Sequence, residues 1–308
     1  MKFLDCYNEN EIILMEGAIG ERLKREYSIF PDNEVALASH VYHKDSKQAL
    51  REIFSQYIQI AETYHYPIMV TTPTRRANKD AVARSEYSLN IIEDNVRFMK
   101  ELSTSPEARI YIGGLMGCRG DAYQATDVLS IEEAVEFHSW QADLFRKENV
   151  DYLYAGIMPA ISEAIGMAKA MEATELPYII SFMIRENGRL IDGTSIHEAI
   201  MQIDEATVNH PLCYMTNCVH PIVLGKALSQ PFNMTEVVHT RFKGIQANTS
   251  PLTPEDLDNC CELMSSDYIC LAEAMADLRN QYQLKIFGGC CGTDQTHMEE
   301  IAKRLKNC

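Results

Sequence analysis

Residues 11–23 read EIILMEGAIGERL and hold the feature that decides between two α/β folds. The apolar run that begins this stretch is typical of a buried strand. A doubly wound dinucleotide-binding sheet usually carries G-x-G-x-x-G directly after its first strand. Here Gly17 and Gly20 are the two glycines that follow the run, and their spacing is different. The sequence therefore argues against a doubly wound sheet.

Short apolar, β-branched runs recur along the chain, and each ends in small or polar residues. With the first included, there are eight, at residues 11–17, 66–72, 108–114, 150–156, 177–182, 211–218, 241–248 and 284–290. Stretches with helical spacing lie between them, at residues 46–65, 85–102, 130–149, 160–173, 195–206 and 267–282. Eight strand-helix units in 308 residues predict a (β/α)8 TIM-type barrel, a single α/β domain that spans residues 1–308.

Composition narrows the expected partners and location. The chain has a formal net charge of -16 and no Lys/Arg cluster, so we expect no nucleic acid partner. Asp5, Glu9 and Glu11 interrupt the N-terminal segment where a signal peptide needs an apolar stretch, and no later segment is long and apolar enough to span a membrane. We therefore expect a cytoplasmic protein with no membrane partner.

In a barrel of this kind the chemistry takes place at the carboxyl ends of the strands. The runs place the following residues there: Glu16, Thr71, Thr72, Gly113, Gly114, Gly156, Ser181, Asn217, Cys218, Asn248, Cys290 and Cys291. Three of them are cysteines, from the sixth and eighth runs, which a closed barrel brings to one rim. Three thiolates select zinc or copper(I) over hard cations and leave a fourth position open, as in catalytic zinc sites.

The other cysteines are predicted to have packing roles. Ten cysteines at irregular spacing in a chain this long are an unlikely disulfide framework, so we expect most of them to be reduced. We assign packing roles to Cys213, Cys260, Cys261 and Cys270, and no role to Cys6 and Cys308 near the termini. The Cys290–Cys291 pair differs from these because glycines flank it at positions 288, 289 and 292. We expect these glycines to let the backbone turn, so that neighbouring sulfurs face one ion.

Three motifs stand at the ends of the predicted strands: GGCCGT at residues 288–293, the Asn217-Cys218 pair, and LMEGAIGERL at residues 14–23. Together they resemble the zinc-dependent homocysteine S-methyltransferases, a family with a homocysteine-binding barrel. The segments at residues 71–78, 113–123 and 175–193 are similar to the family's second, third and fifth strand regions. The resemblance extends over essentially the whole chain.

The resemblance implies a metal site and a substrate site. Cys218, Cys290 and Cys291 would bind Zn²⁺, and the acceptor thiol would take the fourth position. Glu16 and the backbone amides of Gly17 and Ala18 would hold the amino-acid portion of the acceptor. Asn217 and Asn248 match polar positions of the family near the metal and are assigned to substrate binding. No catalytic group beyond the metal ligands is assigned.

The implied activity is transfer of a methyl group to a zinc-activated thiol, homocysteine or a related thiol, to give methionine or another thioether. The donor would be a sulfonium compound such as S-methylmethionine or S-adenosylmethionine, which places the chain in methionine biosynthesis. Two alternatives stay open. The chain could exchange methyl groups with a separate corrinoid protein, or it could be a zinc-binding barrel without catalysis.

The sequence departs from the family near the predicted mouth of the barrel. Gly156 stands after the fourth strand, where the family usually has an acidic residue that binds the ammonium of homocysteine. Glu163 lies on the following helix and is expected to be too far away to replace it. Arg75 and Arg76 stand where the family commonly has smaller residues, which favours an anionic substrate. The identity of the thiol is therefore open.

Overall fold

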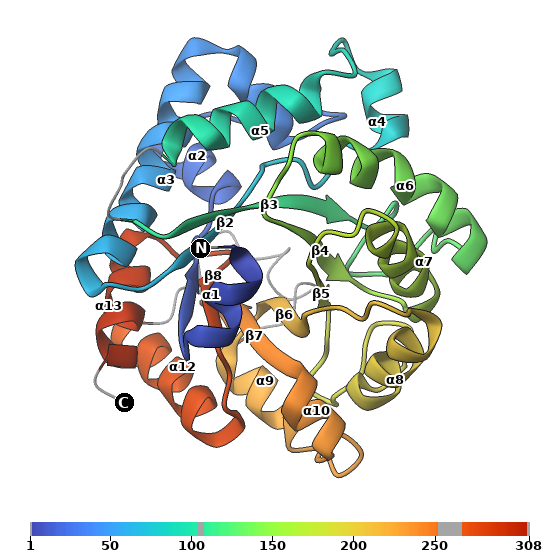
Figure 1. Cartoon of the computed structure of the whole chain (residues 1–308). Helices are drawn as coiled ribbons and strands as arrows, with labels where there is room; N and C mark the ends of the chain where they lie inside the picture. Colours follow the sequence, from blue (N-terminus) through green and yellow to red (C-terminus); the bar gives the residue numbers. More distant parts are fainter. Residues whose placement is uncertain (1, 104–107, 252–266, 307–308) are drawn as a thin grey trace.

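The strands close into a barrel in the computed structural model of the chain, which describes residues 2–103, 108–251 and 267–306. Eight parallel strands follow one another around it in chain order (Figure 1). They are β1 (Ile13–Met15), β2 (Ile68–Thr71), β3 (Ile110–Gly117), β4 (Tyr152–Met158), β5 (Tyr178–Phe182), β6 (Cys213–Val219), β7 (Phe242–Ala247) and β8 (Ile286–Gly289). Pairing of β1 with β8, Ile13 beside Ile286, closes the ring. The predicted single-domain (β/α)8 barrel is confirmed.

Helices surround this barrel. They are α1 (Phe3–Glu9), α2 (Gly20–Tyr27), the 3-10 helix η1 (Leu37–Tyr42), α3 (Lys44–Tyr64), α4 (Lys79–Arg84), α5 (Ile91–Leu102), α6 (Ile131–Lys147), α7 (Ile161–Glu172), α8 (Ile196–Ala206), α9 (Pro221–Leu228), α10 (Glu236–Arg241), α12 (Tyr268–Tyr282) and α13 (Gln295–Lys306). Five of the six predicted helical stretches contain one of them, and the sixth, at residues 46–65, corresponds to α3, which begins two residues earlier. Ser130 and Ser195 begin α6 and α8 with complete capping boxes, which fixes where these helices start.

The core has two layers because successive strand residues point to opposite faces of the sheet. Met15 and Tyr154 belong to the cluster inside the barrel. Their neighbours Leu14 and Leu153 belong to the larger cluster between the strands and the helices. Strands buried on both faces explain the nearly continuous apolar runs of the sequence.

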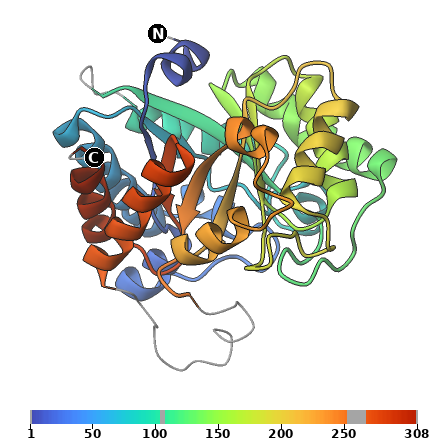
Figure 2. The same cartoon turned by 90° about the horizontal axis from the view of Figure 1, so that it is seen from below.

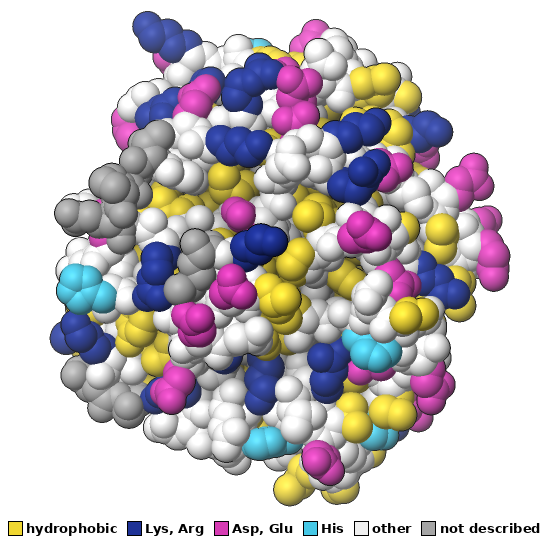
Figure 3. All heavy atoms as spheres, viewed as in Figure 1, with side chains coloured by type: hydrophobic (Ala, Val, Ile, Leu, Met, Phe, Trp, Pro, Cys, Tyr) yellow, Lys and Arg dark blue, Asp and Glu magenta, His cyan; other side chains and the backbone are white. Residues whose placement is uncertain are grey.

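Helix α1 covers one end of the barrel. The ring of Phe3 lies 4.6 Å from that of Tyr152 and 5.4 Å from that of Tyr111, centroid to centroid. The helix lies across the barrel axis in Figure 1, and Figure 2 shows it at one end of the barrel. Acidic and basic side chains are interspersed over this face (Figure 3). Among the residues described, no helix combines the length and the apolar character needed to cross a bilayer.

Two strands extend further than the sequence predicted. Gly113 and Gly114 lie within β3, which continues to Gly117, so they are not at its carboxyl end. A Cβ atom at Gly113 would lie 2.3 Å from the ring of Tyr152, and one at Gly114 would lie 2.5 Å from the ring of Phe145. These glycines therefore make room for aromatic rings and do not end the strand. Strand β4 likewise runs past Gly156.

Candidate functional site

Three cysteine side chains meet at the carboxyl ends of β6 and β8. The Sγ atom of Cys218 lies 2.8 Å from that of Cys290 and 3.4 Å from that of Cys291, although more than seventy positions separate them in the chain. All three sulfurs lie within 4.8 Å of one another, and they form the only such group of three potential metal ligands in the described part of the chain. The barrel thus brings together the cysteines that the sequence predicted to meet.

An unusual backbone conformation directs Cys218 into this cluster. Its φ of 60° is in the left-handed region, which residues other than glycine rarely adopt. The pairing of β6 with β7 shifts register between Asn217 and Val219, so the strand bulges at this cysteine. Such local strain is concentrated at functional sites.

The turn that carries Cys290 and Cys291 is fixed by hydrogen bonds from several elements. The amide of Cys290 donates to the carbonyl of Ala247 at 2.7 Å, and the hydroxyl of Thr293 donates to the carbonyl of Cys290 at 2.7 Å. The amide of Gly292 donates to the carboxylate of Glu21 on α2. Strand β7, helix α2 and Thr293 within the turn therefore fix the position of the two cysteines.

The flanking glycines have different roles from one another, which corrects the sequence prediction. Only Gly292 turns the backbone, with a φ of 83°. Gly288 and Gly289 belong to β8. A Cβ atom at Gly288 would lie 2.6 Å from the Cβ of Met15, and one at Gly289 would lie 2.3 Å from Oγ1 of Thr293. Both glycines are therefore needed for close packing, not for the turn.

Hydrogen bonds concentrate negative charge on one sulfur of the cluster. The thiols of Cys290 and Cys291 and the hydroxyl of Tyr123 all bond to Cys218, and they hold the pKa of its thiol well below the ordinary value. The negative charge of Cys218 in turn raises the pKa of Tyr123, so this phenol stays protonated as a donor. Cys218 is buried, whereas Cys290 and Cys291 are less buried, so the cluster is most open on the side of these two residues.

Glu16 follows β1 and is a buried carboxylate with an unused oxygen. Its side chain is 4 % exposed, and Oε1 accepts a hydrogen bond of 2.5 Å from the hydroxyl of Thr71. Oε2 is buried and has no hydrogen-bond partner among the described residues. Burial raises the pKa of Glu16 to about 7. An unpartnered buried carboxylate oxygen is suited to a cation that arrives with a ligand.

The family model described as homocysteine S-methyltransferase matches residues 13–305. The chain belongs to the homocysteine S-methyltransferase family. Three solved structures of the homocysteine methyltransferase MmuM from Escherichia coli share 17% sequence identity with it, over 96% of this chain and 97% of that one. The metallated and oxidized forms have TM-scores of 0.75, and the apo form has 0.67. At this identity the likeness shows a shared barrel fold.

Several of the other residues predicted for substrate binding make hydrogen bonds within the protein itself. The amide of Ala18 donates to Oγ1 of Thr293 at 3.0 Å, so it already has an acceptor. Oδ1 of Asn217 accepts hydrogen bonds from the amide of Ile157 and the hydroxyl of Ser181, within the wall of the barrel. The side chain of Asn248 is buried just after β7, and the backbone amide of Asn248 donates to the carbonyl of Val219 at 3.1 Å. Gly17 lies beside Glu16, in the first β/α loop.

Glu163 does not replace the acidic residue that the family usually has near Gly156. Its side chain is 1 % exposed, and Oε1 accepts from the amide of Arg119 at 2.7 Å and lies 3.1 Å from Nε2 of His138. The carboxylate is thus occupied between α6, α7 and the end of β3. The sequence analysis expected Glu163 to be too far away; the contacts give a different reason, because its carboxylate already has partners.

Tyr123 is a site residue that sequence reasoning missed. Its hydroxyl lies 3.3 Å from Sγ of Cys218. In the sequence, residues 113–123 are distinguished only by their similarity to the family's third strand region. No residue spacing in this segment predicts a role for Tyr123. Its contact with Cys218 depends on how the loop folds over the rim of the barrel.

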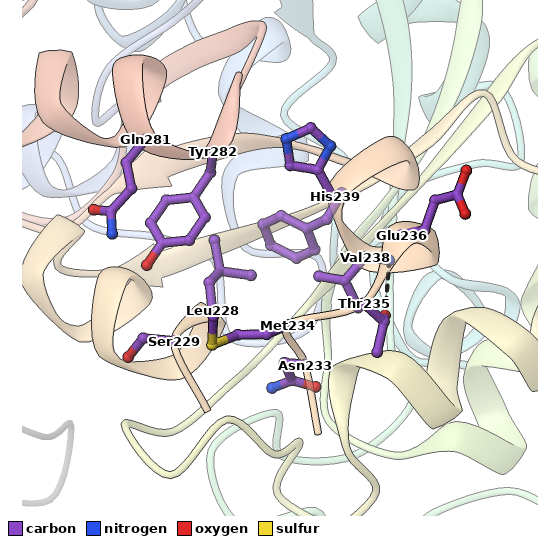
Figure 4. A pocket seen from close by; sticks show the side chains of 11 residues that line it. Leu228, Ser229, Asn233, Met234, Thr235, Glu236, Val238, His239, Gln281 and Tyr282 are labelled. Carbon is purple, nitrogen blue, oxygen red and sulfur yellow. Dashed lines mark hydrogen bonds between the residues drawn. The ribbon is translucent and has the colours of Figure 1, made fainter. Parts of the chain in front are cut away.

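A cavity of about 470 Å³ lies away from the cysteines, between α9, α10 and α12 (Figure 4). Its lining includes Leu228 and Tyr282 at the ends of α9 and α12 and Phe242 at the start of β7. These positions are at the amino end of the barrel strands, whereas the cysteines are at the carboxyl end. The candidate site of this methyltransferase family member is therefore the cysteine cluster.

Proposed function

We propose that this chain is a zinc-dependent S-methyltransferase that moves a methyl group from a sulfonium donor to homocysteine or a related thiol. The observation that carries the proposal is the convergence of the sulfurs of Cys218, Cys290 and Cys291 at the mouth of a barrel of this family. MmuM, which has the same fold, is a homocysteine methyltransferase with a metallated form.

The donor set fits zinc. Soft thiolates favour zinc over hard cations, and three protein ligands leave one position for the acceptor. With Zn–S bonds of about 2.3 Å, two sulfurs in a tetrahedral site lie about 3.8 Å apart. The sulfur of Cys218 lies 2.8 Å from that of Cys290 and 3.4 Å from that of Cys291, so modest outward movement would suffice. Bound zinc would deprotonate the acceptor thiol and hold it as a thiolate.

Residues of the first β/α loop would hold the amino-acid portion of the acceptor. Oε2 of Glu16 would accept hydrogen bonds from its ammonium group, and a cation there would favour the ionised carboxylate. The amide of Gly17 and the side chain of Asn248 are the remaining candidates for the acceptor's carboxylate. The amide of Ala18 contributes by fixing this loop on Thr293.

The reaction needs positioning more than acid–base catalysis. A bond forms between the acceptor sulfur and the methyl carbon while the bond between that carbon and the donor's sulfonium sulfur breaks. The donor leaves as a neutral thioether, so no acid has to protonate it, and the proton of the acceptor thiol goes to solvent. Holding the two sulfurs and the methyl group in line is the main task of the protein.

The test combines metal analysis with activity. The purified protein should bind one zinc, and Cys218→Ala, Cys290→Ala and Cys291→Ala should each lose zinc and methyl transfer. Cys270→Ala is the matched control, because Cys270 lies on α12 outside the cluster and is exposed, which corrects its predicted packing role. Full zinc content and activity in all three cluster variants would contradict the proposal. Bound copper instead of zinc would contradict the choice of metal.

A second arm of the experiment tests the donor. Homocysteine and other small thiols are each combined with S-methylmethionine, S-adenosylmethionine and a methylated corrinoid, and the thioether product is measured. We expect product with a sulfonium donor. Product with the methylated corrinoid alone would replace the sulfonium donor by a corrinoid partner, and no product with any pair would leave a zinc-binding barrel without this activity.

A further inference from the structure

The loop between β3 and α6 brings a phenol to the cysteine cluster. Tyr123 is half-buried in this loop, and its hydroxyl donates to Sγ of Cys218 at 3.3 Å. We propose that Tyr123 is a positioning residue that stabilises the negative charge of Cys218 as a metal ligand and so strengthens the binding of both zinc and the acceptor thiol. This inference rests on the proposed zinc site.

The contact is built into the structure by the elements on either side of the loop. The amide of Tyr123 donates to Oδ1 of Asp121 at 2.7 Å, and its carbonyl accepts from the guanidinium of Arg185, beyond β5, at 3.2 Å. At the start of the loop, the amide of Arg119 donates to the buried carboxylate of Glu163 on α7. The phenol is therefore held over the rim from two sides.

The charge of the site explains why a donor is useful here. Three thiolates around a divalent cation have a net charge of -1, and a fourth thiolate from the acceptor makes it -2. A hydrogen bond from a neutral hydroxyl to a charged sulfur is stronger than one to a neutral group. It stabilises the doubly negative, acceptor-bound state more than the resting state. Loss of the hydroxyl should therefore weaken acceptor binding as well as zinc binding.

The test compares Tyr123→Phe with Tyr282→Phe. Tyr282 is the matched control because its hydroxyl donates to the carbonyl of Gly225 at 3.0 Å, in the cavity of Figure 4 far from the cysteines. Zinc affinity is measured by competition with a chromophoric chelator, and acceptor affinity by titrating homocysteine into the zinc-loaded protein. Tyr123→Phe should lower zinc affinity by roughly tenfold, the usual effect of losing a group that supports a metal ligand. The affinity for homocysteine should fall by a larger factor than the affinity for zinc. Tyr282→Phe should match the wild type in both affinities.

Cobalt(II) substitution gives a readout that loss of packing would not produce. A thiolate without its hydrogen bond is more electron-rich, so the sulfur-to-cobalt charge-transfer band of Tyr123→Phe should move to longer wavelength. An unchanged band together with unchanged zinc affinity would overturn the inference. The same is true if Tyr123→Phe equals the wild type and only Tyr123→Ala is impaired, because the ring and not the hydroxyl would then be responsible.

The two proposals fail differently. If the wild type binds no zinc, or if Cys218→Ala retains it, the proposed zinc site itself is wrong. If the wild type binds zinc through the three cysteines and Tyr123→Phe behaves like Tyr282→Phe, only the role of Tyr123 is wrong. Melting temperatures of the zinc-free variants show whether each is folded before its metal affinity is compared.

Discussion

Oδ1 of Asn217 accepts a hydrogen bond of 3.0 Å from the backbone amide of Ile157. The same oxygen accepts a second one, of 2.6 Å, from the hydroxyl of Ser181. Ile157 has a φ of 57°, and Cys218, next to Asn217, has a φ of 60°. One side chain thus joins β4, β5 and β6 where two of these strands depart from regular geometry. Asn217 therefore supports the conformation that directs Cys218 into the cluster.

Asn217→Ala should destabilise the barrel and weaken the metal site. Without the side chain, the buried amide of Ile157 and the hydroxyl of Ser181 lose their acceptor, at a cost of about 2–4 kcal/mol in the free energy of unfolding. Urea unfolding and zinc affinity measure the two effects. Ser181→Ala is the control, since it removes one donor and should cost only about 1 kcal/mol. Wild-type stability of Asn217→Ala, with impaired acceptor binding, would assign Asn217 to the substrate alone.

Gly292→Ala should disrupt the metal site more than its backbone strain alone would. At a φ of 83°, alanine is strained, and its Cβ would lie 1.9 Å from Oγ1 of Thr249. Gly193 is a matched control, because its φ is 91° and a Cβ there meets no atom within 4 Å. Gly193→Ala should cost only about 1–2 kcal/mol in unfolding free energy. Gly292→Ala should cost more and lose zinc; equal stability and equal zinc affinity of the two variants would contradict this.

The barrel could be predicted from the sequence because the strands are buried on both faces. Each of the eight apolar runs therefore stands out from its surroundings, and strands in regular order bring the sixth and the eighth to one rim. The ends of β3 could not be predicted. Gly113 and Gly114 look like a turn in the sequence, but they make room for the rings of Tyr152 and Phe145, which approach from elsewhere in the chain.

The parts of the site that the sequence missed depend on loop conformation. Tyr123 reaches the cluster because Arg185 and the carboxylate of Glu163 fix its loop. Neither contact can be inferred from hydrophobic periodicity or from the spacing of a motif. The unpartnered oxygen of Glu16 is likewise visible only once Thr71 is seen to occupy the other oxygen. The assignment of Cys260 and Cys261 to packing lies outside the described residues.

Glu16→Gln should stabilise the free protein at high pH. Burial raises the pKa of Glu16 from the ordinary value of 4.5 to about 7, so the folded state binds its proton more tightly than the unfolded state. Wild-type stability should therefore fall, relative to Glu16→Gln, as the pH rises from about 4.5 to 7, by up to about 3 kcal/mol. Below pH 4.5 this pH-dependent difference should vanish.

Urea unfolding of the two proteins at pH 4.5, 6 and 8, without acceptor, measures this difference. Glu205→Gln is the control, because Glu205 is an exposed carboxylate on α8. The same Glu16→Gln protein should bind homocysteine more weakly at pH 8. A difference in stability that does not change between pH 4.5 and 8 would mean that burial does not hinder ionisation of this carboxyl.

Gly156→Glu should improve the use of homocysteine. Its Cβ would lie 3.0 Å from Cδ1 of Leu115 and 3.8 Å from the ring of Tyr154, two side chains of the interior cluster, so the new carboxylate would point into the barrel. Leu115 is a flexible neighbour that can shift by a few tenths of an ångström. A charge-assisted hydrogen bond to the acceptor's ammonium should lower the KM for homocysteine roughly tenfold. Initial rates with a fixed sulfonium donor measure it.

Gly156→Gln separates the charge from the size of this substitution. It makes the same steric demand on Leu115 but has no negative charge, so its KM should stay near that of the wild type or rise. If Gly156→Glu is folded and still leaves the KM unchanged or worse, the ammonium of homocysteine does not lie near this position. Glu16 would then be the principal acidic partner of the acceptor. A thiol other than homocysteine, which needs no second acidic partner near Gly156, would become the better candidate substrate.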